Sequence, residues 1–148
     1  MIRTVRLTRA DLALARALFL TMAGVFEERS EPLDDDYLDR LLGRADFWAM
    51  AAFSGDDLAG GLTAHTLPMT TSPSSAIFIY DIAVRAEHQR QGIGRQLVAA
   101  LRKAAVADGI RDVFVPADND DTHALEFYRA IGGAPTATTI FTFLDDES

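Results

Sequence analysis

The feature that most constrains this chain is a glycine-containing turn between a predicted apolar strand, residues 76–84, and a long predicted helix that begins at Gly92. The turn reads Gln-Arg-Gln-Gly-Ile-Gly-Arg over residues 89–95. Glycines let the backbone approach an anion closely, and a helix N-terminus offers unpaired amides with about half a positive charge. The turn therefore predicts a phosphate-binding site at the start of a helix.

Two nucleotide-binding motifs match this turn only in part. A dinucleotide-binding fingerprint needs a third glycine where this chain has Leu97, and its ribose-binding acid should end a strand, whereas Asp112 precedes one. A nucleoside triphosphate loop needs Gly-Lys-Ser/Thr, but Lys103 is the only lysine in the chain. A turn that serves only the fold stays open as an alternative.

Around this turn, the hydrophobic periodicity predicts strands and helices in mixed order. The expected strands are 2–7, 47–53, 58–67, 76–84, 112–115 and a last one through 138–143, and the expected helices are 11–24, 34–43, 92–108 and 122–131. Strands before and after helices predict an α+β fold with a mixed sheet and one central strand-turn-helix crossover. A length of 148 residues predicts one domain over 1–148.

Charge and composition exclude several classes of partner. Fourteen Lys and Arg residues against 22 Asp and Glu give a net charge of −8, which disfavours nucleic acid because phosphate backbones bind clustered basic residues. No apolar run approaches the ~20 residues of a membrane span. The chain has no cysteine, and His65, His88 and His123 lack metal-ligand spacing. We therefore expect a cytoplasmic protein that binds no metal, no membrane and no nucleic acid.

Residues 89–94 resemble the acetyl-coenzyme A (acetyl-CoA) pyrophosphate loop of the Gcn5-related N-acetyltransferase (GNAT) superfamily. The loop pattern Gln/Arg-x-x-Gly-x-Gly/Ala is met by Gln89, Gly92 and Gly94. A second superfamily element, a helix with Ala, then Tyr and then Gly, is met by Ala124, Tyr128 and Gly132, while Asp121 stands where the superfamily often has Asn. The resemblance implies a single-domain GNAT fold, in which about four helices flank a mixed and mostly antiparallel sheet.

Within that superfamily, the chain is similar to the type I aminoglycoside 3-N-acetyltransferases from about Arg3 to Phe143. The matching runs are Asp36-Tyr37-Leu38, Leu41-Leu42, Ala51-Ala52-Phe53, Leu67-Pro68, Ile79-Tyr80-Asp81, Ala83-Val84, Arg90-Gln91-Gly92-Ile93 and Ala117-Asp118. The chain departs from those enzymes at Gly94, where they usually carry Ala, and at His65, where they carry Tyr. Its loop 69–75 also lacks their basic residue.

The resemblance implies roles for two residues in moving acetyl from a thioester to an amine. Asp81 occupies a family position beside the reacting centre, so we expect it to bind the amine and act as general base. The alternative is an acid at a strand edge that backbone amides satisfy. Tyr128 matches the superfamily tyrosine that protonates the departing thiolate, and the alternative is a core aromatic side chain on a short helix.

The resemblance also implies binding residues for the cofactor and the amine. The expected acetyl-CoA contacts are Ile82, Ala83, Val84, Gln89, Arg90, Gln91, Gly92, Ile93, Gly94, Arg95, Ala124 and Phe127. Carboxylates suit the ammonium groups of a polyamine or aminoglycoside, and the expected ones are Asp35, Asp36, Asp118 and Asp121. A homodimer is the family expectation, with strand pairing of residues 138–143 as the candidate interface.

The sequence therefore predicts an enzyme that moves acetyl directly from acetyl-CoA to a primary amine of an aminoglycoside, at the 3-N position, without a metal. Two alternatives stay open. One is an acetyltransferase for a polyamine, peptide or small-metabolite amine. The other is a non-catalytic acyl-CoA sensor, which would bind the cofactor and raise the melting temperature without turnover.

Overall fold

A computed structural model describes residues 1–145 of the chain. The chain divides into two compact units, residues 1–116 and the residues from Ala117 onward. The first unit contains the sheet and most of the helices, and the second contains one helix, α4 (Thr122–Ala130).

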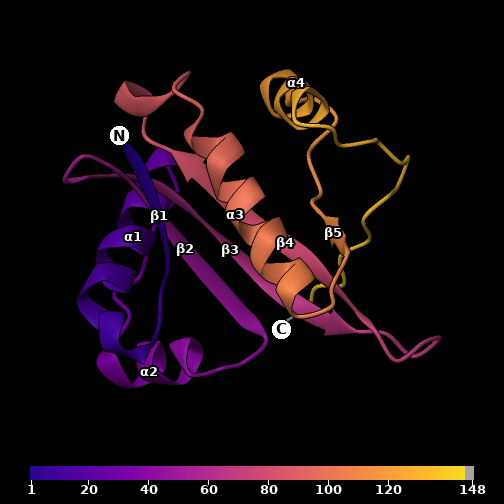
Figure 1. Ribbon diagram of the computed structural model, residues 1–148, viewed down its shortest axis with the longest axis horizontal. Coiled ribbons are helices and arrows are strands. Elements are labelled where there is room, and N and C mark those ends of the chain that lie inside the picture. Colours follow the sequence, from indigo (N-terminus) through magenta and orange to yellow (C-terminus); the bar gives the residue numbers. More distant parts are fainter. Residues whose placement is uncertain (146–148) are drawn as a thin grey trace. The chain divides into compact units, whose positions relative to one another are not determined.

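The sheet has five strands in the order of the sequence (Figure 1). They are β1 (Ile2–Arg6), β2 (Phe47–Ser54), β3 (Asp57–Pro68), β4 (Ser75–Val84) and β5 (Asp112–Phe114). The first three pairings are antiparallel and β4 pairs with β5 in parallel. This arrangement confirms the predicted α+β fold with a mixed, mostly antiparallel sheet and one crossover.

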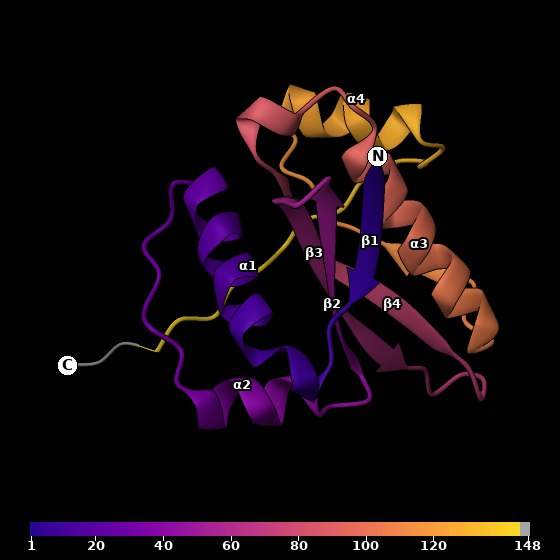
Figure 2. The ribbon, with the colours of Figure 1, turned by 60° about the vertical axis from the view of Figure 1, so that its left-hand side comes forward.

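Helices cover both faces of the sheet (Figure 2). On one face lie α1 (Leu12–Val25) and α2 (Asp35–Leu42), and on the other lies α3 (Ile93–Ala107). Short 3-10 turns, Arg9–Asp11 and Ala86–His88, precede α1 and α3. Because both faces are covered, six consecutive residues of β2 from Phe47 are buried instead of alternating with solvent.

Glycines allow β3 to lie close to its neighbours on both sides. A Cβ at Gly61 would overlap the side chain of Leu18 on α1 and the carbonyl of Met50 on β2. A Cβ at Gly60 would overlap the carbonyl oxygen of Ala83 on β4. The close approach of α1 and β4 to β3 therefore depends on these two residues having no side chain.

Gly60→Ala is expected to lower the free energy of unfolding by roughly 1–3 kcal/mol, because the added methyl group has no room beside β4. Gly24→Ala is the matched control, since Gly24 lies in α1 and an added Cβ there meets nothing. It should raise the free energy of unfolding by about 0.5–1 kcal/mol. Urea unfolding measures both values, and equal stabilities would contradict the close approach of β3 and β4.

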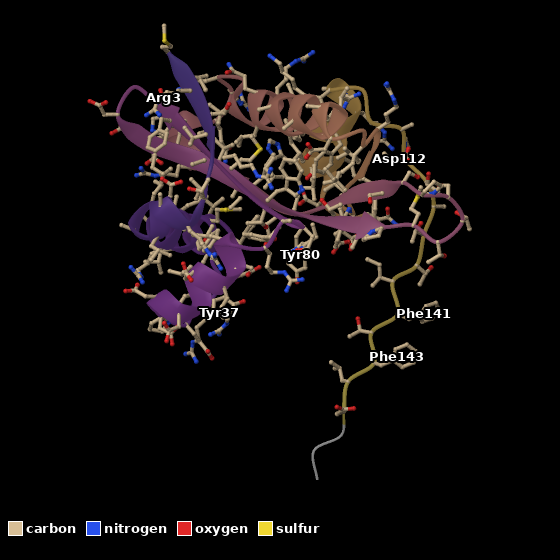
Figure 3. The ribbon with its side chains drawn as sticks, turned by 60° about the horizontal axis from the view of Figure 1, so that its bottom comes forward. Arg3, Tyr37, Tyr80, Asp112, Phe141 and Phe143 are labelled. Atoms are coloured by element: carbon tan, nitrogen blue, oxygen red, sulfur yellow. The ribbon has the colours of Figure 1, made fainter. Side chains whose placement is uncertain are left out.

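The predicted strand through residues 138–143 is wrong for the single chain. This segment is neither helix nor strand, and Ile140, Phe141, Phe143 and Leu144 are 72%, 80%, 95% and 85% exposed (Figure 3). The alternation of Thr and apolar residues suits a pleated strand, but a strand needs a neighbour for its backbone hydrogen bonds. Within residues 1–145 no strand pairs with the segment.

No helix in the described part of the chain has the length and apolar character needed to cross a bilayer.

Candidate active site

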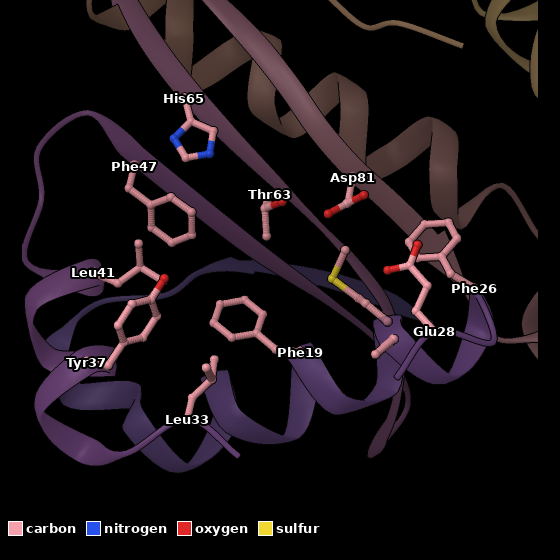
Figure 4. A pocket seen from close by; sticks show the side chains of 12 residues that line it. Phe19, Phe26, Glu28, Leu33, Tyr37, Leu41, Phe47, Thr63, His65 and Asp81 are labelled. Atoms are coloured by element: carbon pink, nitrogen blue, oxygen red, sulfur yellow. The ribbon is translucent and has the colours of Figure 1, made fainter. Parts of the chain in front are cut away.

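A pocket of about 270 Å³ opens on the sheet face that α1 and α2 cover (Figure 4). Most of its wall is apolar or aromatic and includes Phe19, Met22, Phe26, Tyr37 and Phe47. Its polar side chains are Glu28, Thr63, His65 and Asp81. The pocket thus combines aromatic surface with two carboxylates, which is a chemistry suited to a cationic ligand.

A β-bulge turns Asp81 toward this pocket. Thr63 pairs with Asp81 and the next residue of β3, Ala64, pairs with Ile79, so that Tyr80 is an extra residue on β4. In a regular ladder Tyr80 would pair with Thr63, and Asp81 would point to the face that α3 covers. The bulge therefore places Asp81 beside Thr63 on the pocket wall.

The bulge also brings the Tyr80 ring against His65. Their ring centroids lie 6.0 Å apart in an edge-to-face arrangement, and the His65 ring lies 5.4 Å from the Phe47 ring. Three rings from β2, β3 and β4 thus form a continuous row, and two of them, Phe47 and His65, line the pocket. His65, which replaces a family tyrosine, keeps an aromatic ring at this position.

The Asp81 carboxyl is half-buried, and this burial raises its pKa above the ordinary value of 3.8. The negative charge of Glu28 raises the pKa further. Among residues 1–145, no side chain or backbone amide forms a hydrogen bond or ion pair with this carboxylate. The alternative of an acid satisfied by backbone amides therefore has no support in the structure. A perturbed carboxyl group in a pocket is a candidate general base or cation ligand.

The turn after β4 has the geometry of an anion site. Gly92 has a φ of 80° and Arg90 a φ of 64°, so the backbone passes through the left-handed region twice before α3 begins at Ile93. No side chain caps α3, and a Cβ added at Gly92 would meet open space. The Gln89 side chain donates a hydrogen bond to the carbonyl oxygen of Val84, which ties the turn to the end of β4. The first amides of α3 can therefore donate hydrogen bonds to a bound anion.

The predicted cofactor residues in the first unit lie along this path. Ile82, Ala83 and Val84 end β4, while Gln89, Arg90 and Gln91 are exposed turn residues. Ile93 is buried and anchors the start of α3, followed by Gly94 and the exposed Arg95. Strand β5 pairs with β4 only from Ala76 to Phe78, so the same edge of β4 has no strand partner in the described residues at 82–84.

None of the four carboxylates predicted to bind substrate lines the pocket. Asp35 forms an ion pair with Arg16, and neither Asp35 nor Asp36 lines the pocket. In the second unit, Asp118 accepts a hydrogen bond from the Asp120 amide, and Asp121 caps α4 by accepting from the Ala124 amide at 3.0 Å. Each of these three carboxylates thus has a structural partner.

Tyr128 lies in the middle of α4, near the other predicted helix residues of the second unit. Its half-buried ring contacts the Phe127 ring at a centroid distance of 5.2 Å. Ala124 lies one helical turn earlier, and Gly132, with a φ of 101°, follows the end of the helix. The spacing of Ala124, Tyr128 and Gly132 therefore corresponds to one short helix and its C-terminal turn.

Sequence comparison identifies the family. The model of the acetyltransferase (GNAT) family matches residues 13–132. The chain belongs to the GNAT family. Among the described residues of this GNAT protein, no three His, Cys, Asp or Glu side chains come together as a metal site would require. No curated protein matches the sequence.

Solved structures with the same fold include aminoglycoside acetyltransferases. One, from an uncultured soil metagenomic sample and in complex with sisomicin, is 30% identical and has a TM-score of 0.92. The match covers 99% of this chain and 97% of that structure's chain. Another, also from an uncultured soil metagenomic sample, is 27% identical and has a TM-score of 0.91. This match covers 98% of this chain and 99% of that structure's chain. A ribosomal-protein-alanine N-acetyltransferase from Brucella melitensis biovar Abortus 2308 shares the fold at 20% identity, with a TM-score of 0.78. This GNAT protein is an acyltransferase.

Several pocket residues escaped the sequence analysis. Phe19, Met22 and Phe47 follow helix and strand periodicities that predict core positions, and their second role as pocket wall has no separate signal. Glu28 belongs to an acidic stretch in which no pattern distinguishes it from its neighbours. Neither Gly nor Pro marks the bulge at Tyr80. Only the observed pairing of β3 with β4 shows the face of the sheet to which Asp81 points.

Proposed function

We propose that this GNAT protein transfers acetyl from acetyl-CoA to a primary amine of an aminoglycoside, at the 3-N position, by direct transfer in a ternary complex. The observation that carries the proposal is the Asp81 carboxylate, which faces an aromatic pocket and has no cation partner among residues 1–145. The aminoglycoside acetyltransferases at 27% and 30% identity support this class of acceptor. The cytoplasmic location expected from the sequence belongs to the same proposal.

Asp81 is proposed to bind the acceptor ammonium and then to take its proton. Its raised pKa makes the carboxylate a better proton acceptor than an ordinary aspartate, which suits it to general-base work. The neutral nitrogen forms the C–N bond as the C–S bond of the thioester breaks, and the extra proton on the new amide nitrogen leaves to solvent. Tyr128 is proposed to give its proton to the departing thiolate, and solvent then restores the protonation states of both residues.

The start of α3 fits the pyrophosphate of acetyl-CoA. Its first amides have no capping side chain, and the space outside Gly92 is open. When bound, acetyl-CoA supplies the activated acetyl group. We assign the pyrophosphate to the turn 89–95, and the pantetheine arm and thioester oxygen to the backbone of 82–84, whose β5 side has no strand partner in the described part of the chain. Ala124 and Phe127 complete the proposed cofactor contacts.

The remaining ammonium groups of a polycationic acceptor are assigned to Asp35, Asp36, Asp118 and Asp121. All four are exposed, so they keep hydration and can exchange a structural partner for a substrate ammonium. The proposal treats residues 1–148 as one N-acetyltransferase domain. The family match across both units and the 99% coverage of the chain by the sisomicin-bound relative support this view.

Release of free thiol from acetyl-CoA tests the proposal, with sisomicin, kanamycin and spermidine as separate acceptors. We expect release with sisomicin, and product analysis should place the acetyl group on the 3-amine. Release with spermidine alone would favour a polyamine acetyltransferase. A rise in melting temperature with acetyl-CoA but no release with any acceptor would favour a sensor and overturn the proposed enzymatic function.

We also propose that the protein is a homodimer in which residues 138–143 pair with a second copy. The exposed Phe141 and Phe143 support this, because a strand-like segment with apolar side chains is stabilised by a neighbouring strand. Light scattering after gel filtration should give about twice the chain mass of 16.1 kDa. Replacing both phenylalanines by serine should give the monomer mass. A wild-type monomer would contradict the proposal.

A further inference from the structure

We infer that Glu28 is a further acceptor-binding residue, whose carboxylate holds the same incoming ammonium as Asp81. This inference rests on the proposed function, because it assigns a specificity-determining residue to the same pocket. Glu28 lines that pocket, and Figure 4 shows its carboxylate and that of Asp81 on the same side of the cavity.

The backbone after α1 directs Glu28 into the pocket. Helix α1 ends at Val25, and Glu27 adopts a left-handed conformation with a φ of 55°, which is unfavourable for a residue other than glycine. The Glu28 amide then donates to the Ala23 carbonyl at 2.9 Å, and the Glu27 amide donates to the Gly24 carbonyl at 3.1 Å. These two bonds close the chain back over the end of the helix, as in a Schellman turn.

The turn therefore fixes where Glu28 lies. Without the left-handed residue, the chain would continue away from the end of α1, and Glu28 would lose its place beside the sheet. Phe26, immediately before the turn, lines the same pocket as Glu28. A strained residue between two pocket residues points to a functional role for this turn.

Three other titratable side chains line the described pocket wall with Asp81. Besides Glu28, the titratable side chains that line the pocket are Tyr37 from α2 and His65 from β3. No Lys or Arg is among the described residues of the pocket wall. Two carboxylates close enough to affect each other thus lack a Lys or Arg partner among the described residues of the wall, and a substrate ammonium would relieve their repulsion.

The two carboxylates have different tasks in this arrangement. Asp81 lies on β4, is half-buried and is assigned the proton transfer. Glu28 follows the end of α1 and is more exposed, so it suits binding of the charged amine before the proton moves. Glu28 is therefore expected to affect acceptor affinity more than the chemical step.

Glu28→Gln tests the inference, with Glu31→Gln as the matched control. Glu31 lies three residues later and is exposed, but it does not line this pocket. We expect Glu28→Gln to raise the KM for sisomicin roughly tenfold or more, which is the expected cost of one charge-assisted hydrogen bond. The KM for acetyl-CoA should not change. Glu31→Gln should leave both constants at their wild-type values, and Glu28→Asp should recover part of the sisomicin affinity.

The pH profile provides a readout that a purely structural role would not change. Because the charge of Glu28 raises the pKa of Asp81, its removal should move the acidic limb of kcat/KM to lower pH. Glu31→Gln should not move that limb. Equal KM values and pH profiles for Glu28→Gln and wild type, with normal wild-type turnover, would overturn this inference alone. A wild-type protein that releases no thiol with any acceptor would instead overturn the proposed function on which the inference rests.

Discussion

Asp81→Asn is expected to lower kcat by roughly 10²- to 10⁴-fold while raising the melting temperature. The amide has the size and shape of the carboxylate but cannot accept the proton of the amine. The activity loss follows from the general-base role proposed for Asp81. The gain in stability follows from its position, since the half-buried carboxylate lies near Glu28 and has no cation partner among residues 1–145.

The sign of the stability change comes from proton linkage. A folded-state pKa above the unfolded value means that the folded protein binds the proton more tightly. Stability therefore falls as the pH rises from the ordinary carboxyl value of 3.8 through the raised pKa of Asp81. Above that raised pKa the ionised side chain reduces stability, and the amide removes this effect.

Steady-state kinetics and thermal unfolding of the same preparation test both halves of this prediction. Asp56→Asn, in the exposed hairpin between β2 and β3, is the control and should change neither quantity. The wild-type acidic limb of kcat/KM should lie above pH 3.8, because the base must be ionised in the free enzyme. Full turnover by Asp81→Asn would remove the base assignment, whatever the melting temperature.

Tyr128→Phe is expected to lower kcat by roughly 10²-fold, with little change in the KM for either substrate. The variant keeps the ring that contacts Phe127 and removes only the hydroxyl, so packing of α4 should be preserved. Single-turnover kinetics would separate slower chemistry from slower product release. An unchanged kcat would contradict the acid role and return Tyr128 to the alternative of an aromatic packing residue.

Sequence reasoning predicted the fold well where local patterns carry the information. The glycine turn and the amphipathic pattern after it placed the start of α3 at Gly92, which caps the helix with a φ of 80°. The mixed sheet with one central crossover followed from the order of strands and helices along the chain, whereas the strand order itself came only from the structure. The segment 138–143 failed because its alternation indicates strand propensity but cannot show whether a partner strand is present.

The candidate site could be predicted only in part, for a similar reason. Family resemblance identified Asp81 and the turn residues. Nothing in the sequence around Tyr80 shows the bulge that brings Asp81 to the pocket face, because bulges depend on pairing between strands. The left-handed conformation of Glu27 was equally hidden, since glycine or asparagine is the usual signal for such a turn.

The pocket wall and the anion turn come from different stretches of the chain. Within the described residues, all of the pocket wall lies between residues 19 and 65 except Asp81, which is the one wall residue on β4. The anion turn begins after Val84. Substitutions that change the acceptor can therefore accumulate in the first half of the domain without disturbing the binding of an invariant donor. We expect divergence among enzymes of this kind to be uneven, with rapid change before His65 and slow change from Asp81 to Arg95. New amine preferences would then evolve without loss of the acetyl donor.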